Sequence, residues 1–446
     1  MSTIAVARLL ARPTASGRAA LVLPIVAFGI ATALLLTTLA GAISFFRWHD
    51  SLGILYQALA VFASALLLVP LASLGGSAAR LSARRRDDRL ATLRLLGATT
   101  GFVARITVLE SAALAVVGAV AGTLLYVVLT PLVGLIHFRG EAIGALALLL
   151  NPLIVLAVII GVGLLAAVSA AIGLRGVIVS PLGVRTRQTA PKTRWVRLIV
   201  GVIVLGAVVF CVANPDVFGG SVAIIVVLTA AFVAANAVLG LVGPLVIRLF
   251  AKSGLRKAET PQRLIAARTV LESPKAAWRQ VSGVSMTCFI AVFAGTALAM
   301  IGAVSGDRQE YDQLVLLADI RTGVYITLAI SFVMVACSVG VSQASAILDR
   351  RDLYVSLDRL GMPVRTMNAA RARAVLSPLR VVTIGSSVTA AVVVLPLAGV
   401  TLVLAPLSLL TIAASIAAGI LVVALGVVAT RPVLRRVLAE PATLAE

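Results

Sequence analysis

SARRRDDRLATLRLLGAT spans Ser82–Thr99, and ILDRRDLYVSLDRLGMP spans Ile347–Pro363. Each stretch follows a long apolar run and precedes another, and each contains a basic, leucine-rich segment that ends in Leu-Gly. We name them the first and the second Leu-Gly segment. Two such segments in one chain predict an internal duplication, in which each copy places a short helix between membrane-embedded helices.

The composition is that of a polytopic membrane protein. Of the 446 residues, 61% are hydrophobic and 12% are charged, far outside the range of soluble globular domains. No polar stretch is long enough to hold a core of its own, so we expect no independent soluble domain. The first apolar run contains Ala40-Gly41-Ala42, which resembles a signal-peptidase site. Because this run is longer than a signal-peptide h-region, we expect it to remain as the first span.

The apolar runs predict ten membrane spans. We expect helices, because a lipid-exposed backbone must satisfy its own hydrogen bonds, and about 20 residues cross a bilayer core. Several runs are longer than that and predict tilt or cytosolic extension. The predicted spans are 20–46, 53–79, 104–135, 145–175, 196–213, 219–250, 281–303, 321–346, 372–398 and 402–430.

The charge distribution predicts the orientation of the spans. Basic residues gather between alternate runs, around Arg86, Arg187, Arg256 and Arg351, which places these segments and both termini in the cytosol. The net charge of +21 follows from this topology, and we expect no nucleic-acid partner because few aromatic residues interleave with the basic ones. The opposite loops are short and mainly acidic, with Asp50, Glu141, Asp216, Asp307, Glu310, Asp312 and Asp319.

Three pairs of landmarks recur at nearly one spacing and predict a parallel repeat. They are Ala7-Arg8 with Ala267-Arg268, Leu96-Gly97 with Leu360-Gly361, and Pro181 with Pro441. The fold we expect is all-α, with a four-span repeat in residues 1–183, two joining spans in 184–258 and a second four-span repeat in 259–446. The outer loops near residues 47–52 and 303–319 are too short for a large extracytoplasmic domain.

The spans lack the embedded charges that an ion-coupled carrier keeps. Glu110, Arg105 and Arg380 lie near predicted span ends, where long side chains can reach the interface. The chain has no Gly-rich phosphate loop with Gly-Lys-Ser/Thr, so any nucleotide would be held by another chain. The histidines and cysteines predict no metal site or catalytic site: His49 and His137 stand alone, and the apolar runs contain Cys211, Cys288 and Cys337.

On a helix, the leucines of each Leu-Gly segment form one narrow apolar seam, while most arginines point elsewhere. Such a helix can dock its seam into a groove on a partner protein, or it can rest on lipid headgroups. The duplicated Leu-Gly ending favours docking. The residues that we predict to make this contact are Arg85, Arg86, Arg89, Leu90, Leu93, Arg94, Leu96 and Gly97 in the first segment, and Arg350, Arg351, Leu353, Leu357, Leu360 and Gly361 in the second.

The string RRRDDRLATLRLLGATTGFVARITVLESAALAVVGAVAG resembles the signature of the FtsX-like, MacB-type (type VII) ABC permeases. The second copy resembles a degenerate version, since Ala374 stands where the spacing predicts the counterpart of Glu110. The positions of the first copy that carry the resemblance are Arg85, Arg86, Leu93, Leu96, Gly97, Ala98, Leu109, Glu110, Gly118 and Gly122.

The resemblance implies a non-catalytic permease subunit in the bacterial cytoplasmic membrane. Its expected partners are membrane lipid and a cytosolic ABC ATPase, two copies per chain, which would bind ATP and Mg; the chain itself would hold no cofactor. The resemblance further implies export of a hydrophobic or amphiphilic substrate (a peptide, lipid-linked molecule or drug) or mechanotransmission, with unassigned substrate-binding residues. The alternatives are an ATP-driven scaffold that activates a further membrane or extracytoplasmic partner, and an ion-coupled secondary carrier.

Overall fold

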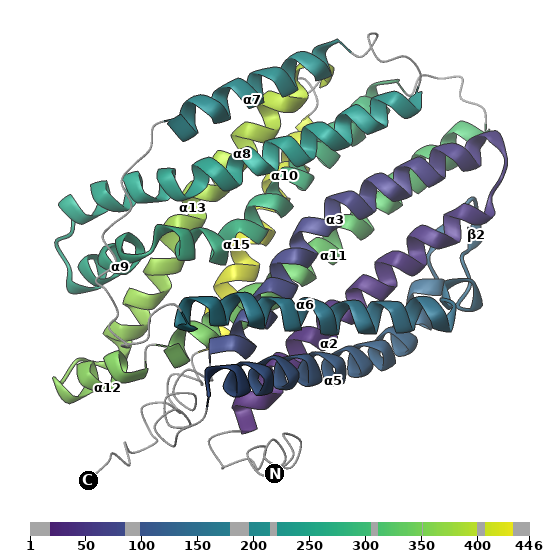
Figure 1. The fold of residues 1–446 in the computed structure, drawn as a ribbon. Helices are drawn as coiled ribbons and strands as arrows, with labels where there is room; N and C mark the ends of the chain where they lie inside the picture. The colour runs from purple at the N-terminus through teal and green to yellow at the C-terminus, as the bar shows by residue number, and fades with distance from the viewer. Residues whose placement is uncertain are drawn as a thin grey trace. The chain divides into compact units, whose positions relative to one another are not determined.

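A computed structural model describes residues 18–84, 99–178, 196–214, 221–304, 311–349, 351–398 and 406–430 (Figure 1). In these ranges the chain is almost entirely helical. The long helices are α2 (Arg18–Ser44), α3 (Ser51–Arg84), α5 (Thr100–Gly134), α6 (Pro152–Ile178), α7 (Val196–Ala213), α8 (Ser221–Arg256), α10 (Pro274–Val304), α11 (Tyr311–Asp349), α13 (Val364–Ala398) and α15 (Pro406–Ala429).

Each predicted span overlaps one of these long helices. Six segments are long and apolar enough to cross a membrane, judged by length and composition over the described residues. They are Pro24–Arg47, Ala104–Gly134, Pro152–Ile172, Val226–Arg256, Leu314–Ile347 and Val364–Pro396. Three shorter apolar segments lie at Leu52–Leu67, Leu198–Ala213 and Ala417–Val428. The fold is thus that of an all-α polytopic membrane protein, while the count of ten spans stays a prediction.

The connection between α5 and α6 differs from the prediction. A two-stranded hairpin, β1 (His137–Phe138) and β2 (Glu141–Ala142), lies in the predicted loop, and a 3-10 turn, η3 (Leu146–Leu148), occupies residues where the fourth span was expected to begin. The helix begins later because proline is suited to a first helical position and asparagine to the position before it. The side-chain oxygen of Asn151 accepts a hydrogen bond from the amide of Leu153 at 2.9 Å, which fixes the start at Pro152.

The helices around the predicted second repeat also depart from the predicted loops. Asp312 and Asp319 were assigned to an outer loop, but both lie on α11, which begins at Tyr311. Asp319 can be helical and buried because its carboxylate receives hydrogen bonds. An additional short helix, α9 (Pro261–Glu272), lies in a segment predicted only as a cytosolic loop. Its sequence is too polar for a membrane span.

The chain divides into two compact units, and the first comprises residues 1–44, 71–137 and 141–189. Among its described helices, α2 packs along α5, and α5 packs against α6. Glycines permit the close approach of α2 and α5, since a Cβ on Gly118 would lie 2.7 Å from the carbonyl oxygen of Ile25. A Cβ on Gly122 would overlap the backbone of Gly29. Small residues four apart are a common way to bring membrane helices together.

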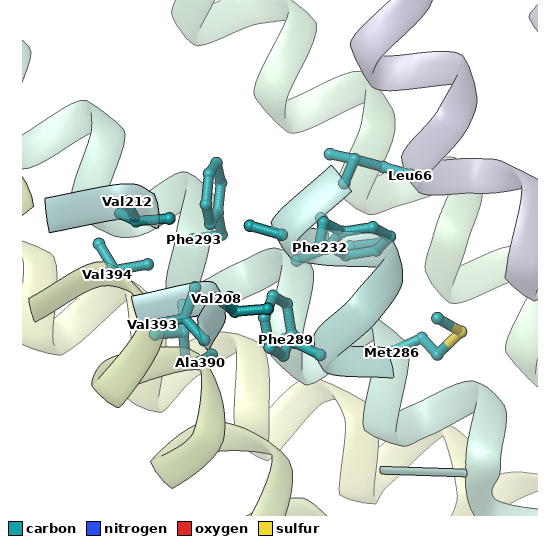
Figure 2. Close-up of a cluster of buried hydrophobic side chains, with 14 residues drawn as sticks. Leu66, Val208, Val212, Phe232, Met286, Phe289, Phe293, Ala390, Val393 and Val394 are labelled. Carbon is teal, nitrogen blue, oxygen red and sulfur yellow. The ribbon is translucent and has the colours of Figure 1, made fainter. Parts of the chain in front are cut away.

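The second unit comprises residues 45–70, 138–140 and 190–446. Helix α10 lies at its centre and packs against α8, α11, α13 and α15. The predicted joining helices α7 and α8 belong to this unit and contribute to its core, in which the Phe232 and Phe289 rings meet edge to face at 5.3 Å. Figure 2 shows these rings with Phe293 among valines from α7 and α13.

Candidate partner-binding surface

The first Leu-Gly segment falls between two described helices. The helix α3 ends at Arg84, and the next described residue is Thr99, which precedes α5. The Thr99 hydroxyl oxygen accepts a hydrogen bond from the amide of Phe102 at 3.4 Å, the arrangement of an N-cap. The predicted contact residues of this segment lie outside the described residues: Arg85, Arg86, Arg89, Leu90, Leu93, Arg94, Leu96 and Gly97.

Most of the second Leu-Gly segment is described. Arg350 lies outside the described residues, and Arg351 is the first residue of a short helix, α12 (Arg351–Arg359). Leu353 is 48% exposed and Leu360 is 82% exposed, while Leu357 is half-buried. Residues spaced by three and four lie on one face of a helix. The structure therefore has an apolar seam that is largely exposed to the surroundings.

Gly361 ends α12 and turns the chain toward α13. The amide of Gly361 donates to the carbonyl of Asp358 at 2.8 Å, and the amide of Met362 donates to the carbonyl of Leu357 at 3.0 Å. Gly361 has a φ of +81°. This pair of bonds with a left-handed glycine is a Schellman motif, which satisfies the last carbonyls of a helix. The Leu-Gly ending is thus a defined turn, and Pro363 follows it as a helix-stopping residue.

The position of α12 leaves its seam accessible within its own unit. It projects at the lower left of Figure 1, near the start of α13. Among the described helices, none packs extensively along it. At its C-terminal end lies Arg359, where a positive charge interacts favourably with the helix dipole. The exposed leucines and the terminal arginine of this surface are suited to docking on protein or on lipid.

The structure contains a second candidate site, which is polar and was not predicted from the sequence. It consists of charged and aromatic side chains around the tip of the β1–β2 hairpin, all within the second compact unit, and we name it the Arg139 cluster. The Arg139 guanidinium donates two hydrogen bonds to the Asp50 carboxylate, at 2.8 and 3.1 Å. These bonds hold the pKa of the Asp50 carboxyl below its ordinary value. The members of the cluster are Phe45, Trp48, Asp50, Tyr56, Phe138, Arg139 and Asp319.

Aromatic rings surround the same guanidinium. Its central carbon lies 4.4 Å from the Trp48 ring centroid and 4.9 Å from that of Tyr56, both within cation–π range. Phe45 packs edge to face on Phe138 at 5.0 Å. The Arg139 side chain is therefore fixed on one side by an ion pair and on the other by two rings.

Asp319 joins the hairpin tip to α11 and α3. Its Oδ2 accepts a hydrogen bond from the Tyr56 hydroxyl at 2.6 Å and another from the Arg139 amide at 2.8 Å. Only 6% of Asp319 is exposed, so both bonds offset the cost of a buried carboxylate. The sequence signal for this site was present but weak: Arg139 was a basic residue among acidic outer loops, next to a glycine.

The backbone of Arg139 is unusual. Its φ is +55°, and Arg139 is the one non-glycine residue with positive φ among the described residues. Gly140 follows with a φ of +79°, so both central residues of the hairpin have the positive φ that a type I′ turn requires. Asparagine or glycine is the usual first residue of such a turn, and the left-handed conformation costs a long side chain roughly 1–2 kcal/mol.

The described residues contain no cluster of three or more His, Cys, Asp or Glu side chains that could hold a metal ion. Cys288 is buried, and Cys211 and Cys337 are partly buried, as free thiols within α10, α7 and α11 respectively. Glu110, Arg105 and Arg380 lie on exposed positions of α5 and α13. Ala374 is partly buried and packs against apolar side chains of the second unit, where a glutamate would need a partner.

Residues 61–177 match the family described as FtsX-like permease C-terminal. No curated protein and no solved structure matches the chain. The matched stretch extends from α3 through the first Leu-Gly segment, α5 and the hairpin to the end of α6. Permeases of this family are generally non-catalytic membrane subunits that work with an ATPase partner. Residues 61–177 are thus similar to the C-terminal domain of an FtsX-like permease, which suggests the permease component of an ABC transporter.

Proposed function

We propose that the chain is the membrane subunit of a MacB-type (type VII) ABC transporter, driven by two copies of a separate cytosolic ATPase. The match over residues 61–177 carries this proposal, because it includes the whole first Leu-Gly segment. The exposed seam and Schellman turn of α12 support a second docking helix of the same kind. ATP and Mg belong to the partner, and the cargo is a hydrophobic or amphiphilic molecule that is exported or acted on by mechanotransmission.

Two four-helix repeats in one chain would take the place of a permease dimer. The packing supports this arrangement. In the first unit, the helix of the first predicted span, α2, packs most extensively against the helix of the third, α5. In the second unit, the helix of the seventh predicted span, α10, packs most extensively against the helix of the ninth, α13. The first and third helices of each predicted repeat thus pack together. The divergence of the second copy, including Ala374, makes its docking contact the weaker of the two.

The first test of this proposal is capture of an ATPase. The tagged full chain would be purified from its own cells in mild detergent, and bound ATP hydrolysis would be measured with Mg-ATP and inhibited with orthovanadate. We expect ATP turnover that co-elutes with the permease. A monodisperse permease without any bound ATPase would contradict the proposed function. Stimulation of turnover by an apolar cargo would favour transport over the activation of a membrane partner.

The second test is the orientation. We expect the hairpin side to face outward and the α12 side to face the cytosol, as the basic residues predict. In a variant whose native cysteines are replaced, a cysteine in place of Leu146, which is 83% exposed, should react with an impermeant maleimide on intact cells. A cysteine in place of the exposed Lys257 should react only after permeabilisation. The reverse labelling pattern would contradict the orientation.

A further inference from the structure

We infer that the Arg139 cluster is a latch that links the two helices leading into the Leu-Gly segments, and that it opens when the partner ATPase binds nucleotide. The inference rests on the proposed function and extends it to the opposite side of the membrane. It assigns a role to a hairpin tip that neither the family match nor the predicted docking segments explain.

The first observation is connectivity. The helix α3 begins at Ser51, directly after Asp50, and continues to Arg84, where the first Leu-Gly segment follows. The helix α11 carries Asp319 near its start and continues to Asp349, where the second Leu-Gly segment follows. Each helix therefore has the Arg139 cluster near one end and a docking segment at the other.

The second observation is the direct bond between these helices. The Tyr56 hydroxyl on α3 donates to the Asp319 carboxylate on α11 at 2.6 Å. The hairpin tip closes over this bond, since the Arg139 amide reaches the same carboxylate oxygen and its guanidinium lies over the Tyr56 ring. The ion pair with Asp50 then ties the tip to the residue that precedes α3. One arginine thus holds three chain segments together.

The third observation is the conformation of that arginine. An arginine with a φ of +55° occupies a position where asparagine or glycine would be more stable. Such outliers persist when surrounding contacts hold them, and they gather at switch regions and ligand clamps. Here the surrounding contacts are the cluster itself. When Asp50, Asp319 and the rings move apart, those contacts are lost and the backbone of Arg139 can relax.

The bonds of the latch are also of a kind that can open. The Asp50–Arg139 pair is exposed, so separating it leaves both charges in water rather than in lipid. The buried part is limited to Asp319 and the ring of Tyr56. A small movement of α11 relative to α3 would break two hydrogen bonds at one oxygen of Asp319.

The test is hydrogen–deuterium exchange of the peptide that covers residues 137–142. It would be measured in the permease–ATPase complex in nanodiscs, without nucleotide and with Mg-ATPγS. We expect nucleotide to raise exchange in the wild type. In Tyr56→Phe, exchange should be raised roughly tenfold before nucleotide is added, the effect of losing about one hydrogen bond. In Arg139→Asn, which loses the exposed guanidinium contacts but keeps the backbone amide bonded to Asp319, exchange should be raised by a smaller factor. In both variants nucleotide should add little. Arg139→Asn gives Asn-Gly, the preferred hairpin turn, so the hairpin itself stays intact.

The matched control is Arg321→Gln. Arg321 lies on α11 close to Asp319 but pairs with Tyr325 rather than with the cluster, so this variant should exchange like the wild type. Wild-type exchange that does not respond to nucleotide in a complex that hydrolyses ATP would overturn the latch and leave the proposed function standing. Exchange in Tyr56→Phe and Arg139→Asn that equals the wild type without nucleotide would also overturn it. Absence of any bound ATPase would overturn the proposed function, and the nucleotide-driven opening with it.

Discussion

Replacing Leu353 and Leu360 with aspartate is expected to reduce the ATPase bound per permease from two copies to one. Both side chains are exposed, at 48% and 82%, so the change should leave the fold and the melting temperature unaltered. Placing two carboxylates in an apolar groove costs about 1–3 kcal/mol each or more. A total of about 4 kcal/mol weakens binding by roughly a thousandfold. The measurement is the ATPase-to-permease ratio after size-exclusion chromatography.

Two controls separate docking from lipid contact. Leu353→Met with Leu360→Met keeps an apolar seam of similar volume and should retain both ATPase copies. Leu353→Lys with Leu360→Lys should be tolerated by a helix that rests on anionic headgroups, but it should release the ATPase from a docked helix. The aspartate pair in the first segment, Leu93→Asp with Leu96→Asp, should cause the larger loss. Full ATPase binding by all aspartate variants would assign both segments to the lipid surface.

Gly122→Ala is expected to have the largest effect on stability. A Cβ at this position would overlap the backbone of Gly29 and would lie 2.9 Å from the Cβ of Thr32. Backbone cannot rotate away as a side chain can, so α2 and α5 would have to separate along their interface. Overpacking of this kind costs typically about 1–3 kcal/mol. We expect a lower melting temperature in detergent and a smaller yield of monodisperse protein.

Alanine substitutions at the glycines of this interface should lower the melting temperature by different amounts. Gly118→Ala should also destabilise the protein, since its Cβ would lie 2.7 Å from two atoms of α2. Gly29→Ala should cost less, because its Cβ would be 3.3 Å from the carbonyl oxygen of Gly118. Gly161→Ala on α6 is the control, since its Cβ meets nothing within 4 Å and alanine favours a helix. Equal melting temperatures for all four variants would contradict close packing of α2 on α5.

The long helices could be predicted from the sequence because a chain exposed to lipid must satisfy its own backbone hydrogen bonds. A run such as Ala104–Gly134 must be helical to satisfy its backbone, and its composition alone identifies it. The glycine spacing of Gly118 and Gly122 was also visible, although its packing partner on α2 was not. Which helices meet depends on side-chain shape across the interface, and a single sequence does not display that complementarity.

The Arg139 cluster could not be predicted for a different reason. Its members come from positions 45–56, 138–139 and 319, and no local pattern connects them. Asp319 looked like a loop residue because a carboxylate inside an apolar helix is costly, and only the distant Tyr56 and Arg139 make it acceptable. The α9 helix was missed because its polar composition resembles that of a loop, although Thr260-Pro261 was an available start signal.

The continuity of α11 has a mechanical consequence. Thirty residues separate Asp319 from Asp349, and at 1.5 Å per residue the helix between them is about 45 Å long. No proline interrupts it. A tilt of about 5° at one end, amplified over this lever arm, displaces the other end by about 4 Å, more than the length of a hydrogen bond. The Tyr56–Asp319 hydrogen bond would therefore break at tilts of α11 that are too small to repack the helices around it.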